Sequence, residues 1–344
     1  MSLLSCLCTA VQVWASAPAL PAPITNNAVA ARSDGERVTV YSFLGLDSTK
    51  RWSGVSSRVF RWEVGTPAWE ELRPIPGPGR LAATAQAIGD RLYVFGGYTV
   101  AEDGSEQSLP HVDVYHPDTE TWSRGAPIPV PVDDAVSGVW RDSLVYLVSG
   151  WHDGDNVSNV QIYDPARDTW SQATPIPGQP VFGHTGAVAG NAIIYIDGAR
   201  RSDDDPRYVL EPSTWRGDID PTNPTVISWR RLARHPDPSL YRSAAVAVGT
   251  WIVFAGGTDN PYNYDGIGYN RLPAHARDAV WAFDTVSNEW HPGATLPTPT
   301  MDHRGIAVAG AHMIIVGGMM GNQQVTPGVV IAEVQDVLPP ETRR

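Results

Sequence analysis

Short apolar runs, rich in β-branched and aromatic residues, alternate with clusters of glycine, proline and other turn residues along nearly the whole chain. Six of these runs end in glycine: VYSFLG (40–45), LYVFGG (92–97), VYLVSG (145–150), IIYIDG (193–198), IVFAGG (252–257) and MIIVGG (313–318). Runs of this length and composition, bounded by turn residues, predict short β-strands rather than helices. The pattern therefore predicts an all-β protein.

A second marker lies between the glycine runs. Six tryptophans are each followed by a proline seven residues later: Trp14, Trp69, Trp122, Trp170, Trp229 and Trp290. Seven residues before four of them stands another aromatic residue, as a hairpin between a third and a fourth strand requires: Trp62, Tyr115, Tyr163 and Phe283. Two interleaved sets of six predict six units of about 57 residues. These units resemble kelch repeats, and they predict a six-bladed β-propeller with four antiparallel strands in each blade.

The position of Trp14 predicts how the ring closes. The last unit, residues 301–336, has three predicted strands and no tryptophan, whereas residues 11–21 contain an isolated tryptophan strand. We therefore expect a single propeller over residues 11–336, with blade six built from both of these segments and a tail at residues 337–344. Closure by an N-terminal strand removes an open sheet edge. The alternative is that Trp14 belongs to a leader peptide.

Composition and charge narrow the classes of partner. The chain has 32 glycines and 30 prolines, as a turn-rich propeller requires, and 42% hydrophobic residues, enough for a sizeable core. Its 25 basic and 37 acidic residues give a net charge of −12. A nucleic-acid partner is therefore not expected, because phosphate binding needs a basic face. We also expect no membrane-spanning segment.

The first ten residues, 1–10, are interpreted as the remnant of a signal or lipoprotein leader. The start MSLLSCLCTAVQV has an apolar stretch ending in a small residue, and LLSC resembles a bacterial lipobox, although a basic region is lacking. We therefore expect an extracytoplasmic protein, periplasmic or secreted, with a lipoprotein as a further option. Cys6 and Cys8 both precede the first predicted strand, so the body of the propeller contains no disulfide and no cysteine-ligated metal.

Polar residues gather where the chain enters each inner strand. If the first strand of each blade is innermost, the loop that enters it and the loop after the glycine run emerge on the same face. The residues at these six entrances are Asn26-Asn27, Arg80, Asp133-Asp134, His184, Tyr241-Arg242 and Asp302-His303-Arg304. They converge on the mouth of the central channel, where a concave ligand site is expected. The alternative is that they only solvate the channel and bind adjacent blades to one another.

Three loops after glycine runs add candidates on this face. WHDGDN (151–156) offers Trp151 and His152, ARRSDDDPR (199–207) offers Asp204 and Arg207, and the long loop 257–278 offers Asp259, Tyr262 and Tyr264. Aromatic rings with amide and carboxylate neighbours suit a sugar, whose C–H faces stack on rings while its hydroxyls need donors and acceptors. The alternative for the long loop is a lid that only packs on a neighbouring blade. The consecutive aspartates lack the spacing of a calcium loop, so we expect no metal and no cofactor.

The marker set, from Trp14 to about residue 336, resembles six-bladed kelch proteins, and in particular the bacterial N-acetylneuraminate mutarotase group, periplasmic sugar-processing propellers also closed by their N-terminal strand. The resemblance implies acid/base isomerisation at an anomeric carbon, with an arginine holding the substrate carboxylate. The family's glutamate falls at Ala199 here, and Arg207 is the nearest match for its arginine. Similar sequences are also labelled galactose-oxidase-like, but the copper-radical site needs a cysteine-linked tyrosine that Cys6 and Cys8 cannot supply.

Two functions follow from these candidates. The first is an extracytoplasmic mutarotase-like sugar isomerase, in which His303, His184 or Asp204 transfers protons and Arg242, Arg304 and Arg207 hold a polar or anionic sugar. Histidines that titrate near neutrality suit such proton transfer. The second is a non-catalytic propeller whose mouth binds a glycan or a protein segment. Further ligand contacts are expected from the remaining mouth residues: Arg80, Asp134, Trp151, His152, Tyr241, Asp259, Tyr262 and Tyr264.

Overall fold

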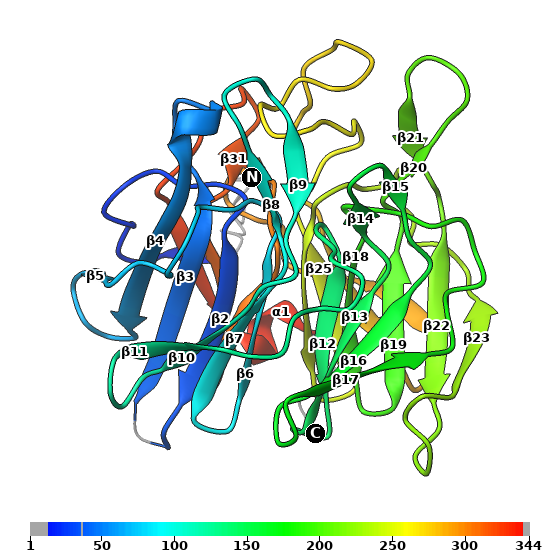
Figure 1. Ribbon diagram of the computed structural model, residues 1–344, viewed down its shortest axis with the longest axis horizontal. Coiled ribbons are helices and arrows are strands. Elements are labelled where there is room, and N and C mark those ends of the chain that lie inside the picture. The colour runs from blue at the N-terminus through cyan, green and yellow to red at the C-terminus, as the bar shows by residue number, and fades with distance from the viewer. Residues whose placement is uncertain (1–12, 36, 340–344) are drawn as a thin grey trace, which may run out of the picture.

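Six four-stranded antiparallel sheets are arranged around a central axis in the computed structural model, which describes residues 13–35 and 37–339 (Figure 1). Blade one contains β2 (Ala28–Ser33), β3 (Val38–Leu46), β4 (Val55–Glu63) and β5 (Glu70–Leu72), with a 3-10 turn at Trp52–Gly54. Blade two contains β6 (Thr84–Ile88), β7 (Arg91–Phe95), β10 (Val112–His116) and β11 (Thr121–Arg124). Blade three contains β12 (Val136–Trp140), β13 (Leu144–Val148), β16 (Val160–Asp164) and β17 (Thr169–Ala173).

The remaining blades repeat this order. Blade four contains β18 (Thr185–Ala189), β19 (Ala192–Ile196), β22 (Thr214–Ile219) and β23 (Ile227–Arg231). Blade five contains β24 (Ala244–Val248), β25 (Trp251–Ala255), β26 (Val280–Asp284) and β27 (Glu289–Pro292). Blade six contains β29 (Ala307–Ala309), β30 (His312–Val316), β32 (Val329–Glu333) and β1 (Ala15–Ser16), and a short helix, α1 (Val334–Val337), follows β32. The predicted fold class, a six-bladed propeller of four-stranded blades, is confirmed.

The N-terminal strand closes the ring as the sequence predicts. Strand β1 pairs with β32 through Ala15 and Ile331, and the Trp14 side chain is only 1% exposed. The leader expected over residues 1–10 lies outside the described residues. Within them, no helix is both long enough and apolar enough to cross a membrane.

The six repeated tryptophans link neighbouring blades by one recurring hydrogen bond. Each indole N–H donates to the backbone carbonyl four residues after the tryptophan of the preceding blade, at 2.7–3.4 Å. The series includes Trp14, whose indole N–H donates to the Ala294 carbonyl at 2.7 Å, and Trp69, whose indole N–H donates to Pro18 at 2.8 Å. Trp14 is therefore the sixth member of the repeat, and its interpretation as part of a leader is wrong. The bonds let a large ring fill the space between blades without leaving its N–H unpaired.

The glycine that ends each second strand is required by the turn toward the mouth. Gly198 has a φ of +90°, and a Cβ added there would lie 2.6 Å from the Cβ of His184. A left-handed backbone in close contact with the inner strand admits only glycine without strain. The chain then forms short hairpins beyond three blades: β8 (Tyr98–Val100) with β9 (Glu106–Ser108), β14 (Trp151–His152) with β15 (Asp155–Asn156), and β20 (Ala199–Arg201) with β21 (Tyr208–Leu210). In blade six, β31 (Met319–Met320) instead pairs with β28 (Thr300–Met301), which lies in the loop that enters the inner strand.

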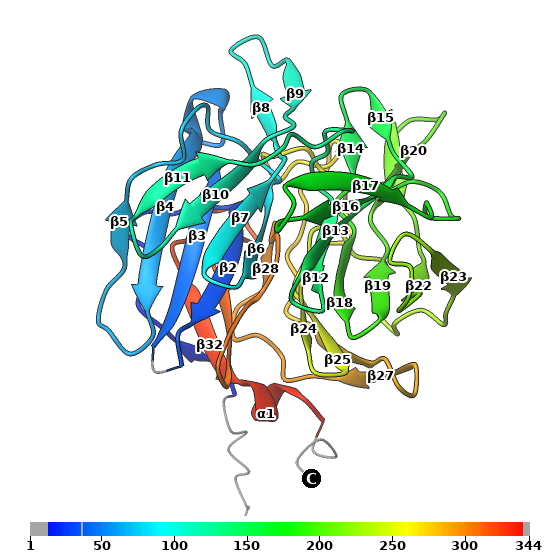
Figure 2. The same cartoon turned by 60° about the horizontal axis from the view of Figure 1, so that its bottom comes forward.

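The entrance loops and the loops after the glycines lie on one face, which we call the mouth face. Backbone bridges join them directly, between Asp133 and Trp151 and between Phe182 and Ala199. Figure 2 shows the hairpins β8–β9 and β14–β15 on the side of the propeller opposite to α1. The inner strands β2, β6, β12, β18, β24 and β29 contact one another in this order around the axis. Polar residues of the mouth face are thereby brought over the central channel.

Candidate functional site

A ring of six left-handed residues encircles the axis at the mouth face. One residue of each entrance loop has a φ between 50° and 69°: Asn26, Ala82, Asp134, Gly183, Arg242 and Asp302. In five of them the backbone N–H donates to the carbonyl of the equivalent residue in the preceding blade, at 2.8–3.2 Å. The N–H of Ala82 instead donates to the side-chain oxygen of Asn26 at 2.5 Å, which completes the circle. The ring fixes the directions of its side chains with respect to one another.

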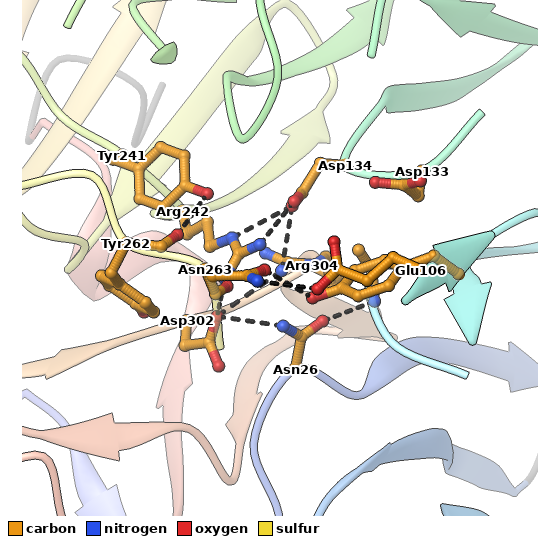
Figure 3. Close-up of polar contacts among 12 residues, drawn as sticks. Asn26, Glu106, Asp133, Asp134, Tyr241, Arg242, Tyr262, Asn263, Asp302 and Arg304 are labelled. Atoms are coloured by element: carbon orange, nitrogen blue, oxygen red, sulfur yellow. Dashed lines mark hydrogen bonds and ion pairs between the residues drawn. The ribbon is translucent and has the colours of Figure 1, made fainter. Parts of the chain in front are cut away.

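Four charged side chains from this ring and from the residues beside it form a network that we call the polar plug: Asp134, Arg242, Asp302 and Arg304 (Figure 3). Arg242 donates to both carboxylate oxygens of Asp134, Nε at 3.1 Å and Nη2 at 2.5 Å, and its Nη1 lies 3.2 Å from Asp302. Arg304 Nη2 lies 2.9 Å from Asp134. These side chains are at most 4% exposed, so the buried charges stay ionised only because two cations meet two anions.

The electrostatics of Asp134 follow from this pairing. Burial alone would raise the pKa of its carboxyl, but the guanidinium groups of Arg242 and Arg304 outweigh burial and lower the pKa below its usual value. The Arg242 guanidinium also lies 4.8 Å from the ring centre of Tyr241 and 5.2 Å from that of Tyr262. Asp134 and Arg242 therefore stay charged, and Arg242 is held between aromatic faces and carboxylates.

A cavity of about 150 Å³, which we call the mouth pocket, opens above the polar plug. It is lined by Tyr98, Glu106, Asp133, Asp134, Trp151, Phe182, Tyr208, Arg242, Asn263 and Tyr269. The aromatic walls pack against one another, with ring centres of Trp151 and Tyr208 5.5 Å apart and those of Tyr208 and Tyr269 4.5 Å apart. The pocket thus combines aromatic walls, on which a sugar ring can stack, with polar groups that can bind hydroxyls.

Two carboxyl groups of the mouth pocket have no cationic partner among residues 13–35 and 37–339. Asp133 is 3% exposed and accepts a hydrogen bond from the Ser108 hydroxyl at 2.6 Å, while Glu106 accepts one from the Asn263 amide at 2.7 Å. Burial raises the pKa of Asp133 well above its usual value, and the nearby Asp134 carboxylate adds to this shift. Shielding from water also raises the pKa of Glu106, but this residue is exposed, unlike Asp133. Raised carboxyl pKa values in a pocket are typical of acid/base groups.

Asn263 connects these acids to the polar plug. Its side-chain oxygen accepts from the Tyr98 hydroxyl at 3.3 Å, its amide donates to Glu106, and its backbone carbonyl accepts from Arg242. It lies in the long loop 257–278, which packs over the mouth. This loop therefore contributes directly to the pocket, in addition to covering a neighbouring blade.

Below the plug, the central channel has a volume of about 310 Å³ and is lined mainly by small residues of the inner strands. His184 and His303, which the sequence suggested as proton-transfer groups, border this channel rather than the mouth pocket. The His184 Nε2 lies 2.9 Å from the Val148 carbonyl, and the His303 Nε2 lies 2.9 Å from the Thr300 hydroxyl. Burial lowers the pKa of each to about 4. The expectation that they titrate near neutrality is wrong, because both side chains are buried just before the inner strands begin.

The structure brings together part of the set expected at the mouth. Trp151 lines the pocket, and Asp134, Arg242 and Arg304 form the plug. Arg80 does not reach them: it is 1% exposed and ion-paired with Asp113 of β10.

Two of the expected tyrosines serve as packing. Tyr241 and Tyr262 are fully buried, and the Tyr241 hydroxyl donates to the Tyr262 carbonyl at 2.9 Å. They support the plug from behind rather than lining the pocket.

Five more candidates lie outside the pocket lining. Asp204 and Arg207 are exposed in the β20–β21 hairpin, and the Arg207 guanidinium lies 5.4 Å from the ring centre of Tyr208. His152 lies beside Asp153, with 3.9 Å between Nδ1 and Oδ2. Asp259 pairs with Arg277, and Tyr264 packs against Leu46 and its apolar neighbours.

Glu106 was not among the expected residues, nor were Tyr98, Phe182, Tyr208, Asn263 and Tyr269. Glu106 follows the glycine run 92–97, and the rule that placed loops 151–156 and 199–207 on the mouth face applies equally to that loop. The signal was therefore present in the sequence.

Comparison with known proteins finds a repeat motif, similar proteins and a similar solved structure. The kelch motif matches residues 79–129 and 142–177. The Kelch-like protein terF of Aspergillus terreus is 23% identical over 331 residues, which are 95% of this chain and 56% of that protein. The chain thus spans just over half the length of this relative. The solved structure of YjhT superimposes with a TM-score of 0.72 at 19% identity, over 90% of this chain and 95% of the other.

N-acetylneuraminate epimerases are also similar. That of Salmonella typhi is 28% identical over 158 residues, which are 44% of this chain and 38% of that protein. That of Yersinia enterocolitica is 32% identical over 92 residues, which are 26% of this chain and 22% of that protein. The protein is therefore a kelch propeller that resembles the N-acetylneuraminate epimerase group.

Proposed function

We propose that this propeller binds a single sugar ring in the mouth pocket and isomerises it at the anomeric carbon, with Glu106 and Asp133 as the acid/base pair. The observation that supports this most directly is the presence of two carboxyls with raised pKa values and no cationic partner in a pocket walled by aromatic rings. The similarity to N-acetylneuraminate epimerases adds support for a carbohydrate ligand.

The proposed reaction needs two proton transfers to open the ring and the reverse two to close it. Asp133, whose pKa burial raises furthest, holds the proton that it gives to the ring oxygen, while Glu106 accepts the proton of the anomeric hydroxyl. The bond between the anomeric carbon and the ring oxygen breaks and leaves an open-chain carbonyl. After rotation about the adjacent carbon–carbon bond, the ring closes and both protons return. Asn263 holds Glu106 in place during this exchange.

The family's glutamate position does not take part in this scheme. Ala199 is fully buried and its backbone bridges to Phe182, so it carries no proton-transfer group. The acids proposed here come from blades two and three instead of blade four.

We also propose an extracytoplasmic location, on the sequence of residues 1–10 alone.

The test is NMR exchange spectroscopy on reducing sugars, with and without the protein. We expect faster interconversion of anomers for at least one sugar, and a loss of about 10²- to 10⁴-fold in that acceleration for Glu106→Gln or Asp133→Asn. Glu102→Gln is the matched control, because Glu102 is exposed in the same hairpin region and does not line the pocket. Binding without acceleration would favour the non-catalytic propeller, and no binding of any sugar would refute the carbohydrate proposal.

A further inference from the structure

The mouth pocket has an unbalanced charge. Its charged lining consists of Glu106, Asp133, Asp134 and Arg242. Within the polar plug the two arginines are matched by Asp134 and Asp302, so these four charges cancel. Glu106 and Asp133 remain, and neither forms an ion pair with any residue that the structure describes. With Asp133 protonated, as in the proposed reaction, Glu106 keeps one uncompensated negative charge.

The arginines that the sequence suggested for a substrate carboxylate are already occupied. Arg242 donates from Nε and Nη2 to Asp134 and from Nη1 to Asp302 and the Asn263 carbonyl. The Arg304 side chain is 4% exposed, donates from Nη2 to Asp134 and Asp302, and does not line the mouth pocket, although its buried Nε has no partner. A ligand carboxylate in the mouth pocket could take over the bonds of Arg242 only by displacing a buried carboxylate, which would leave that group without its partner. Arg207 lies over Tyr208 in the β20–β21 hairpin and does not line the mouth pocket.

We infer that the mouth pocket accepts uncharged and amino-bearing sugars and rejects acidic sugars, because its two unpaired carboxyls face the ligand while its guanidinium groups are held in the polar plug. This inference rests on the proposed function, since it assumes that the ligand is a sugar. It assigns a substrate class different from that named for the N-acetylneuraminate epimerases to which the chain is similar.

Two further observations agree with this class. The Asp133 carboxylate accepts one described hydrogen bond, from Ser108 to Oδ2, so its Oδ1 can accept from a ligand hydroxyl or ammonium group. Burial is the main cause of the raised pKa of Asp133, but the carboxylates of Asp134 and Glu106 add to it. A further negative charge placed beside these acids is therefore opposed, and a positive charge there is favoured. Like charges placed together at a binding site strongly disfavour the wrong partner.

The experiment compares sugars of the same ring configuration that differ in one substituent and in the charge that it carries. Titration calorimetry at pH 7 uses three matched series, gluco, galacto and manno, each as the neutral sugar, the 2-amino sugar and the uronic acid, together with N-acetylneuraminic acid. In the series that binds, we expect the uronic acid to bind at least about tenfold more weakly than the neutral sugar, and the amino sugar to bind at least as tightly. In the Glu106→Gln/Asp133→Asn double variant, this difference should fall to less than about threefold.

Control variants separate the pocket from the surrounding surface. Glu102→Gln and Arg207→Ala should leave the order of the sugars unchanged, because neither residue lines the pocket. An acidic sugar that binds as tightly as its neutral counterpart, or a double variant that keeps the full difference, would overturn the inference while leaving the proposed carbohydrate function intact. If no sugar of any charge binds, the proposed function itself fails and the inference fails with it.

Discussion

Removing the charge of Asp134 tests whether the polar plug stabilises the propeller. Asp134→Asn keeps the shape of the side chain but leaves two buried guanidinium groups facing Asp302 alone, with Arg242 at 3.2 Å and Arg304 at 3.5 Å. Breaking a buried ion pair from one side costs about 3–5 kcal/mol, because the remaining charge is buried without compensation. With an unfolding entropy of about 2.1 cal/mol/K per residue over 344 residues, the melting temperature should fall by about 4–7 °C.

The assay is calorimetric melting at pH 7, supported by urea unfolding. Glu71→Gln is the exposed control: its carboxylate pairs with Arg58 through two bonds of 2.8 and 2.9 Å, yet loss of such a surface pair should cost no more than about 1 kcal/mol. A second variant, Asp134→Asn/Arg304→Met, restores one cation to one anion and should recover part of the lost stability. The reasoning is refuted if Asp134→Asn costs no more than the surface control, or if the double variant is no more stable than the single one.

Two further predictions concern the channel and the ring closure. His184 and His303 have pKa values of about 4 in the folded protein and about 6.5 in the unfolded chain. Between these two pH values the unfolded chain therefore binds more protons than the folded protein. The free energy of unfolding is highest above pH 6.5 and should fall by about 3 kcal/mol per histidine as the pH approaches 4. Urea unfolding at pH 7 and pH 4.5 measures this loss, which His303→Gln should reduce and the half-exposed His312→Gln should not. Trp14→Phe removes the indole N–H that donates to Ala294 and should lower the free energy of unfolding in urea by about 1–2 kcal/mol. Trp290→Phe, which removes the equivalent hydrogen bond of another blade, should have a similar cost. A cost for Trp290→Phe without one for Trp14→Phe would contradict closure by the N-terminal strand.

The blade architecture could be predicted from the sequence because its determinants repeat. Trp14 could be assigned to blade six from its distance to a proline. In the structure its indole N–H donates to the carbonyl that is equivalent to the partners of the other five tryptophans. The glycine that ends each second strand is likewise set by a local backbone requirement, as at Gly198. Such features depend on short segments of chain, so spacing alone reveals them.

The pairing of the mouth residues could not be predicted in the same way. Asp134 and Arg242 belong to blades three and five, and the equivalent residue of the blade between them is Gly183, which has no side chain. Their ion pair depends on how six loops meet around the axis, and no sequence spacing encodes that distance. For the same reason the histidines were expected in a polar, hydrated mouth, whereas His184 and His303 lie within the channel wall and have lowered pKa values.

The contrast between Ala199 and Glu106 shows how a repeated scaffold permits chemistry to change position. Every blade places its loop after the second strand on the mouth face, but an acid in such a loop reaches the pocket only where the loop turns toward the axis, as at Glu106 and not at Asp204. Here the loop of blade four begins with a buried alanine, while the hairpin of blade two places Glu106 beside Asn263, and the entrance of blade three contributes Asp133. The blades fix where a carboxyl can lie, but each loop decides whether one is present. An acid that replaced Ala199 at the start of the blade-four loop would therefore approach the axis from a different blade than Glu106 does.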